Sequence, residues 1–76
     1  MKNNAELQTD VQNAIEWEPL LHAAEIGVTA KDGVVSFTGL VDSYSKKLEA
    51  GRIAWKTSGI WHVKNELIVD YEYAFS

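Results

Sequence analysis

The chain has 76 residues, 46% of them hydrophobic, with no cysteine, one proline and a formal net charge of −4. This length allows one domain with one small core and excludes a second domain. The apolar content is that of a globular domain rather than of a disordered tail. Because there is no cysteine, the chain forms no disulfide bond and offers no thiolate as a nucleophile or metal ligand.

The net negative charge argues against nucleic acid as the main partner, because phosphate binding depends on clustered lysine and arginine. The charge is unevenly distributed: residues 1–30 carry five acidic side chains and one lysine, whereas residues 31–64 carry six basic and three acidic side chains. The start of the chain lacks the apolar stretch of a secretory signal, and no apolar run approaches the roughly 20 residues that span a bilayer. We therefore expect a cytoplasmic protein, or a periplasmic one if these residues belong to a longer precursor.

The first predicted element is an amphipathic helix that ends at about Trp17. Asn3 or Asn4 is available as its N-cap, and Pro19 disfavours helical geometry at the residue before it. The apolar stripe at helical spacing consists of Leu7, Val11, Ala14 and Ile15. We expect Trp17 to close one end of the core, because tryptophan is largely buried on average. Residues 20–25 are expected to add a short turn.

Two strands follow, because residues 25–31 and 34–41 have alternating side-chain patterns. Between them, Asp32 and Gly33 form the signal for a tight hairpin, in which glycine accepts the positive φ that other residues resist. Gly39 is then expected on the buried face of the second strand. There, the missing side chain would let a helix or an aromatic ring approach the strand closely.

A second helix is predicted over about residues 43–58, with Asp42 or Ser43 as its N-cap and Gly59 as its C-terminal stop. Its small and apolar residues at helical spacing are Ala50, Ile53, Ala54 and Thr57. A third strand is predicted within residues 60–73. Its core-facing residues would be Val63, Asn65, Leu67, Val69 and Tyr71.

These elements predict an α+β domain with the order αββαβ. Two helices and three strands bury one core only if both helices cover the same face of a small three-stranded mixed sheet, which leaves the other face open to solvent. The residues predicted for that open face are polar, namely Thr29, Ser36, Thr38, Lys64 and Glu66.

Three motifs, in this order and spacing, resemble a BON domain, the bacterial osmotically inducible and nodulation domain. They are G-x-V-x-F-x-G-x-V at residues 33–41, a serine-led helix with spaced alanines from residue 43, and G-I-x-x-V-x-N-x-L-x-V at residues 59–69. The chain is thus expected to be one BON-like domain over residues 1–76, with its core at about 7–70 and a tail at 71–76, similar to a module of cytoplasmic multi-BON proteins. Gly51 departs from the pattern, because a helix-forming residue is usual there.

The resemblance implies the αββαβ fold and a structural role for the matching residues Gly33, Gly39, Gly59 and Asn65. It also implies a non-enzymatic binding module, for phospholipid membranes in envelope maintenance and osmotic stress, without catalytic residues. Independently, His22 and His62 are the only histidines, too few for a zinc site without several carboxylates. We expect neither a metal nor a cofactor.

The residues predicted to bind lipid or a partner are Lys46, Lys47, Arg52, Trp55, Lys56 and Trp61. The cations would attract anionic lipid and a tryptophan would enter the interface. In the alternative interpretation, the tryptophans edge a small core and the lysines are merely solvated. A different functional alternative is protein interaction or self-association, in which the acidic first helix meets the basic second helix of another copy, or open sheet faces pair. A small-ligand carrier or enzyme would require a deep polar pocket.

Overall fold

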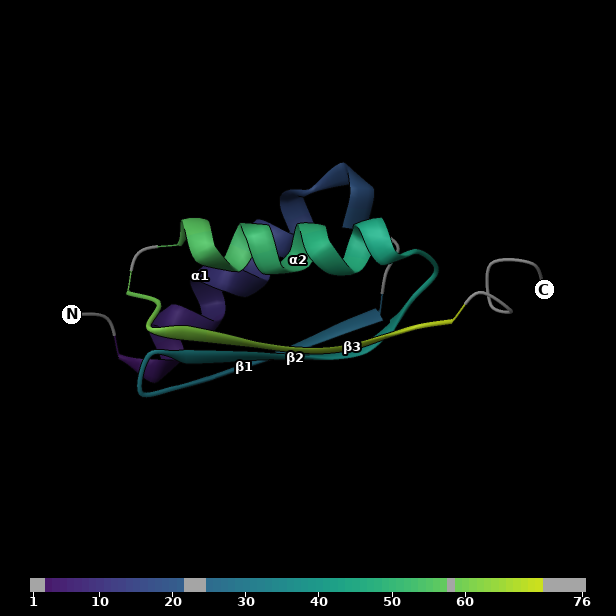
Figure 1. Cartoon of the computed structure of the whole chain (residues 1–76). Coiled ribbons are helices and arrows are strands. Elements are labelled where there is room, and N and C mark those ends of the chain that lie inside the picture. The colour runs from purple at the N-terminus through teal and green to yellow at the C-terminus, as the bar shows by residue number, and fades with distance from the viewer. Residues whose placement is uncertain (1–2, 22–24, 58, 71–76) are drawn as a thin grey trace.

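The computed structural model describes residues 3–21, 25–57 and 59–70. In chain order the elements are α1 (Asn4–Trp17), the 3-10 turn η1 (Pro19–Leu21), β1 (Glu25–Lys31), β2 (Val34–Val41), α2 (Tyr44–Lys56) and β3 (His62–Val69). The strands lie in the order β1-β2-β3, with β1 antiparallel and β3 parallel to β2. Both helices cover one face of the sheet (Figure 1). The predicted α+β class, element order and mixed sheet are confirmed.

The start of α1 is fixed by two asparagine side chains. Asn3 is the N-cap, and its Oδ1 accepts a hydrogen bond from the backbone N–H of Glu6 at 2.8 Å. Asn4 Oδ1 accepts one from the backbone N–H of Asp32, also at 2.8 Å. The first helical turn is thereby tied to the turn between β1 and β2, a contact 28 residues distant in the chain.

The prediction that Trp17 closes the core is wrong, because its side chain is 85% exposed. Leu7, Val11 and Ile15 form the buried stripe of α1 as predicted. Trp17 follows Ile15 by two residues, which places it about 200° further around the helix axis, on the side away from the sheet. Leu21 of η1 is buried instead and covers this end of the core.

The core lies between the helix layer and the sheet. Phe37, on the central strand, is fully buried and is the largest of the fully buried side chains. The buried apolar residues are Leu7, Val11, Ile15, Leu21, Val28, Val35, Phe37, Val41, Ala50, Ile53, Ala54 and Leu67. The opposite face is exposed at Thr29, Thr38, Lys64 and Glu66, with Ser36 half-buried. The predicted buried face is therefore confirmed, and the opposite face carries the predicted polar residues together with exposed Leu40 and Ile68.

The hairpin between β1 and β2 is confirmed as a two-residue turn. Asp32 and Gly33 have φ angles of 53° and 80°, the left-handed values that a tight hairpin turn requires at both central positions. The turn also contacts β3, since the carbonyl of Gly33 accepts hydrogen bonds from the N–H groups of Trp61 and His62 at 2.7 and 3.2 Å.

Gly39 is needed for a reason other than the one predicted. It does lie on the buried face of β2, but its φ is 130°, and a Cβ there would come within 2.0 Å of the Glu25 carbonyl oxygen. The close neighbour is thus the backbone of the adjacent strand β1 rather than a helix or an aromatic ring. The residue is a point of close strand contact, where the left-handed backbone conformation favours glycine.

The packing of α2 on β3 depends on Asn65. Its side-chain Nδ2 donates to the carbonyl of Lys47 in α2 at 2.8 Å, and its Oδ1 accepts from the N–H of Leu67 at 3.3 Å. A Cβ on Gly51 would lie 3.3 Å from Asn65 Nδ2, so the glycine gives this amide room to reach the helix. The departure of Gly51 from the usual pattern is thereby explained.

The ends of α2 and β3 lie close to their predicted positions. Ser43 is the N-cap of α2 and accepts from the N–H of Lys46 at 3.3 Å. The helix ends one residue before Thr57, and Gly59 follows with a φ of 93°. Predictions that involve Tyr71 and the rest of the tail at residues 71–76 lie outside the described residues.

Candidate binding surfaces

The described residues contain no arrangement that suggests metal or redox chemistry. No group of three or more His, Asp or Glu side chains is placed to hold a metal ion in the described part of the chain, and His22 lies outside it. Within the same residues, no polar or charged side chain is buried. None of the helices described is both long and apolar enough to cross a membrane.

One flank of α2, the charged flank, carries ion pairs. Lys46 Nζ lies 2.8 Å from Asp42 Oδ1, and Arg52 donates two hydrogen bonds to the carboxylate of Glu49, one of them 3.1 Å from Nε to Oε2. The hydrogen bond between Arg52 and Glu49 favours the charged form of each group. It therefore lowers the pKa of Glu49 and raises the pKa of Arg52. Two of the predicted lipid-binding cations are therefore paired with acids on the same surface.

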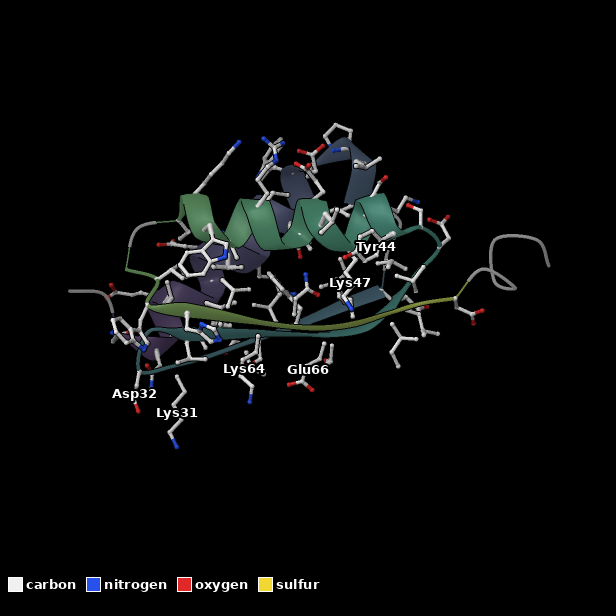
Figure 2. The ribbon with its side chains drawn as sticks, in the orientation of Figure 1. Lys31, Asp32, Tyr44, Lys47, Lys64 and Glu66 are labelled. Atoms are coloured by element: carbon white, nitrogen blue, oxygen red, sulfur yellow. The ribbon has the colours of Figure 1, made fainter. Side chains whose placement is uncertain are left out.

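The other flank of α2 is apolar and lies beside β3. We define the α2–β3 flank as Tyr44, Lys47, Leu48, Gly51 and Trp55. Four of them recur at i, i+4, i+7 and i+11, the spacing of one helical stripe. The three large apolar side chains are each slightly over half exposed. Figure 2 shows Tyr44 and Lys47 on the near side of α2, next to β3.

A third surface forms the end of the molecule at the β1–β2 turn. A hollow of about 660 Å³ is lined there by Asn3, Asn4, Asp32, Gly33, Gly59, Ile60 and Trp61. We call this region the hairpin end. Trp61 is 77% exposed, whereas its backbone is fixed by the hydrogen bond to Gly33. Exposed Lys31 adjoins the turn (Figure 2), and exposed Lys56 closes α2 five residues before Trp61.

The predicted binding residues therefore belong to three places rather than one. Lys46 and Arg52 lie in the ion pairs of the charged flank, where the charge of Lys56 also acts on Glu49. Lys47 and Trp55 lie on the α2–β3 flank, and Trp61 lies at the hairpin end. Sequence reasoning did not select Lys31 or Tyr44. The helical spacing of Tyr44, Leu48 and Trp55 carried the signal for the second surface, whereas nothing local placed the β1–β2 turn, which Lys31 adjoins, beside Trp61.

The chain matches the BON domain family over residues 3–71 and belongs to that family. The BON domain is a family of non-catalytic binding modules associated with phospholipids and osmotic stress. The chain is also 45% identical over 47 residues to an "Uncharacterized protein in gshII 5'region" from Anaplasma centrale. The aligned part covers 62% of this chain but only 31% of that relative.

Proposed function

We propose that this BON domain is a non-enzymatic module that associates with anionic phospholipid surfaces through its hairpin end. The observation that carries the proposal is the exposure of Trp61. A large aromatic side chain, 77% exposed, projects from a backbone held by the 2.7 Å hydrogen bond to Gly33. An amphipathic indole of this kind gains free energy at the boundary between headgroups and acyl chains.

Two cations favour the same orientation. Lys31, which adjoins the β1–β2 turn, and Lys56, the last residue of α2, are exposed, and each contributes up to about 1 kcal/mol near an anionic surface. Asp32 offsets part of this attraction. Elsewhere acids are frequent: Glu16 and Glu18 flank the exposed Trp17. A protein of net charge −4 would be repelled by anionic lipid in most orientations, so we expect approach by the hairpin end.

The proposal is tested by flotation with neutral vesicles and with phosphatidylglycerol/cardiolipin vesicles, at low and at moderate salt. We expect binding to the anionic vesicles alone, weakened by salt because the lysine contribution is screened. Trp61→Ser should reduce flotation strongly. Trp17→Ser is the matched control, since it removes an equally accessible tryptophan from an acidic region. Absence of flotation for the unchanged protein, or equal loss with both variants, would contradict the proposal.

Self-association between the acidic α1 of one copy and the basic α2 of another is less favoured, because Asp42 and Glu49 already occupy two of the cations on α2. The proposed association of the family with envelope maintenance and osmotic stress agrees with a lipid-surface role. The headgroup preference is measured in the same vesicle series.

A further inference from the structure

Among residues 3–21, 25–57 and 59–70, no strand pairs with the outer edge of β3. This strand is the last of the sheet, and Figure 1 shows it at the side nearest the viewer with no strand beyond it. The N–H groups of His62 and Asp70 donate to the β2 side of the sheet. Because backbone groups alternate along a strand, odd-numbered residues of β3 direct their N–H and C=O groups outward. The N–H of Leu67 agrees, since it bonds the Asn65 side chain instead of β2.

The charges on β3 are complementary to a second copy of the same strand. Lys64 and Glu66 lie on the open face of the sheet with Nζ and Oε1 4.0 Å apart, and Figure 2 shows both projecting away from the helices. In an antiparallel β3 pair with Asn65 opposite Asn65, each Lys64 faces Glu66 of the other copy. Sliding one strand by two residues in either direction places Lys64 opposite Lys64 or Glu66 opposite Glu66, which is unfavourable.

In such a pair, a two-fold axis at Asn65 relates the two copies, and the α2–β3 flank is complementary to its own copy across that axis. Asn65 contacts α2 at the Lys47 carbonyl and at Gly51, so a two-fold axis at Asn65 passes near the middle of the stripe. Two antiparallel α2 helices related by that axis would place Tyr44 opposite Trp55 and Leu48 opposite Gly51. Each large side chain would then meet either an aromatic partner or the space left by glycine.

The spacing of the two layers is also compatible. Asn65 reaches α2 at its flank, and α2 packs on both β2 and β3, so the helix lies inward of the free edge. A helix above the gap between two strands would lie about 10 Å from its symmetry mate, once the two β3 strands pair at about 4.8 Å. This separation is at the upper end of the usual range for packed helices.

We propose that a second copy of this chain docks along β3, forming a two-fold dimer with a continuous six-stranded sheet and the two α2 helices side by side. Leu67 N–H would exchange the Asn65 side chain for the Val63 carbonyl of the second copy. Lys47, whose stem lies on the flank, would extend its ammonium to solvent. Pairing of identical edges and burial of an exposed apolar stripe are the two driving contributions.

Charge reversal tests this arrangement without lipid. Lys64→Glu and Glu66→Lys each place like charges opposite across the axis, whereas the double variant restores opposite charges. Sedimentation equilibrium should show dimers of the unchanged chain, about tenfold weaker association for each single variant, and recovery in the double variant. A protein that stays monomeric up to roughly millimolar concentration, or a double variant no better than the single ones, would overturn the proposal.

A second variant tests the helix layer. Leu48→Glu places a charge on the stripe and should abolish dimerisation, with an unchanged circular dichroism spectrum because Leu48 is exposed in one copy. Leu20→Glu introduces the same charge at another exposed leucine and should leave association intact. Equal loss with both variants would overturn the proposal. A monomer that still floats with vesicles would retain the lipid proposal alone, and a dimer that does not float would retain this one alone.

Discussion

The two edges of the sheet are held by different means. β1 is joined to β2 by a two-residue turn, and all seven of its residues pair with β2 in one register. At Gly39 the backbones of these strands are so close that a side chain has no space. β3 arrives through the helix α2 and is anchored to it by the side chain of Asn65. Beyond that anchor, the edge of β3 beside the apolar helix flank is unpaired within the part of the chain that the structure describes.

The difference shows which contacts leave a surface available for binding. In the hairpin, the backbone groups on one side of β1 pair with β2, and α1 packs over β1. The backbone groups of β3 that face β2 are paired with that strand, whereas those on the opposite side have no partner strand among the described residues. The Asn65 side chain covers the centre of this outer edge by accepting from the N–H of Leu67. Changes at the β1 side should therefore affect folding, whereas changes at the β3 side should affect both folding and association.

The largest expected effect is on the β1 side, with Gly39→Ala. The φ of 130° and the 2.0 Å approach to the Glu25 carbonyl would force the two strands apart. We expect a loss of about 3 kcal/mol in the free energy of unfolding, measured by urea denaturation. Gly33→Ala is the control. Its φ of 80° is left-handed as well, but the nearest atom, Trp61 Cβ, is 3.0 Å away, so a smaller loss of about 1 kcal/mol is expected.

On the β3 side, Asn65→Ala should have the next largest effect. It removes the hydrogen bond to the Lys47 carbonyl and the one from Leu67 N–H. These bonds are partly buried, so we expect a loss of about 1–2 kcal/mol in the free energy of unfolding. Lys64→Ala, on the exposed face of the same strand, should change stability by less than about 0.5 kcal/mol. Similar losses for the two variants would show that Asn65 is not the anchor of β3.

Gly51→Ala sharpens this comparison. Alanine favours the helix by up to about 1 kcal/mol, but its Cβ would lie 3.3 Å from the Asn65 amide nitrogen. We therefore expect a smaller gain in stability in the unchanged chain than in the Asn65→Ala background, where the crowding is gone. A double-mutant cycle by thermal unfolding measures the coupling. Equal effects in both backgrounds would mean that Gly51 does not accommodate Asn65.

The smallest effect is expected on the charged flank of α2. Arg52→Gln removes the hydrogen bond that lowers the pKa of Glu49, so the pKa should rise toward its ordinary value in an NMR titration. Lys56→Gln should raise the pKa of Glu49 less, because Lys56 acts only through its charge. A carboxyl with a lowered folded pKa stabilises the fold above its unfolded pKa. This stabilisation disappears as the pH falls through the folded pKa, and Arg52→Gln should therefore weaken that pH dependence.

Several features could be predicted from the sequence because they depend on residues that are close together in the chain. The stripe of α1, the alternation of the strands, the Asn3 and Ser43 caps and the turn at Asp32 and Gly33 all follow from local spacing and turn chemistry. Trp17 was misplaced because burial was inferred from residue type, whereas its angle around α1 points it to solvent. The same angular argument groups Tyr44, Leu48 and Trp55 on one stripe of α2, although Tyr44 was not selected from the sequence.

The sequence by itself determined the order αββαβ, the two faces of the sheet and the membership of the BON family. Only the tertiary structure decided how the candidate binding residues are divided, because their neighbours come from distant segments. Lys46 and Arg52 are occupied by acids on the same surface, while Trp61 meets the β1–β2 turn through Gly33. Local patterns encode helix and strand periods, but which surfaces remain open depends on contacts formed when the elements pack.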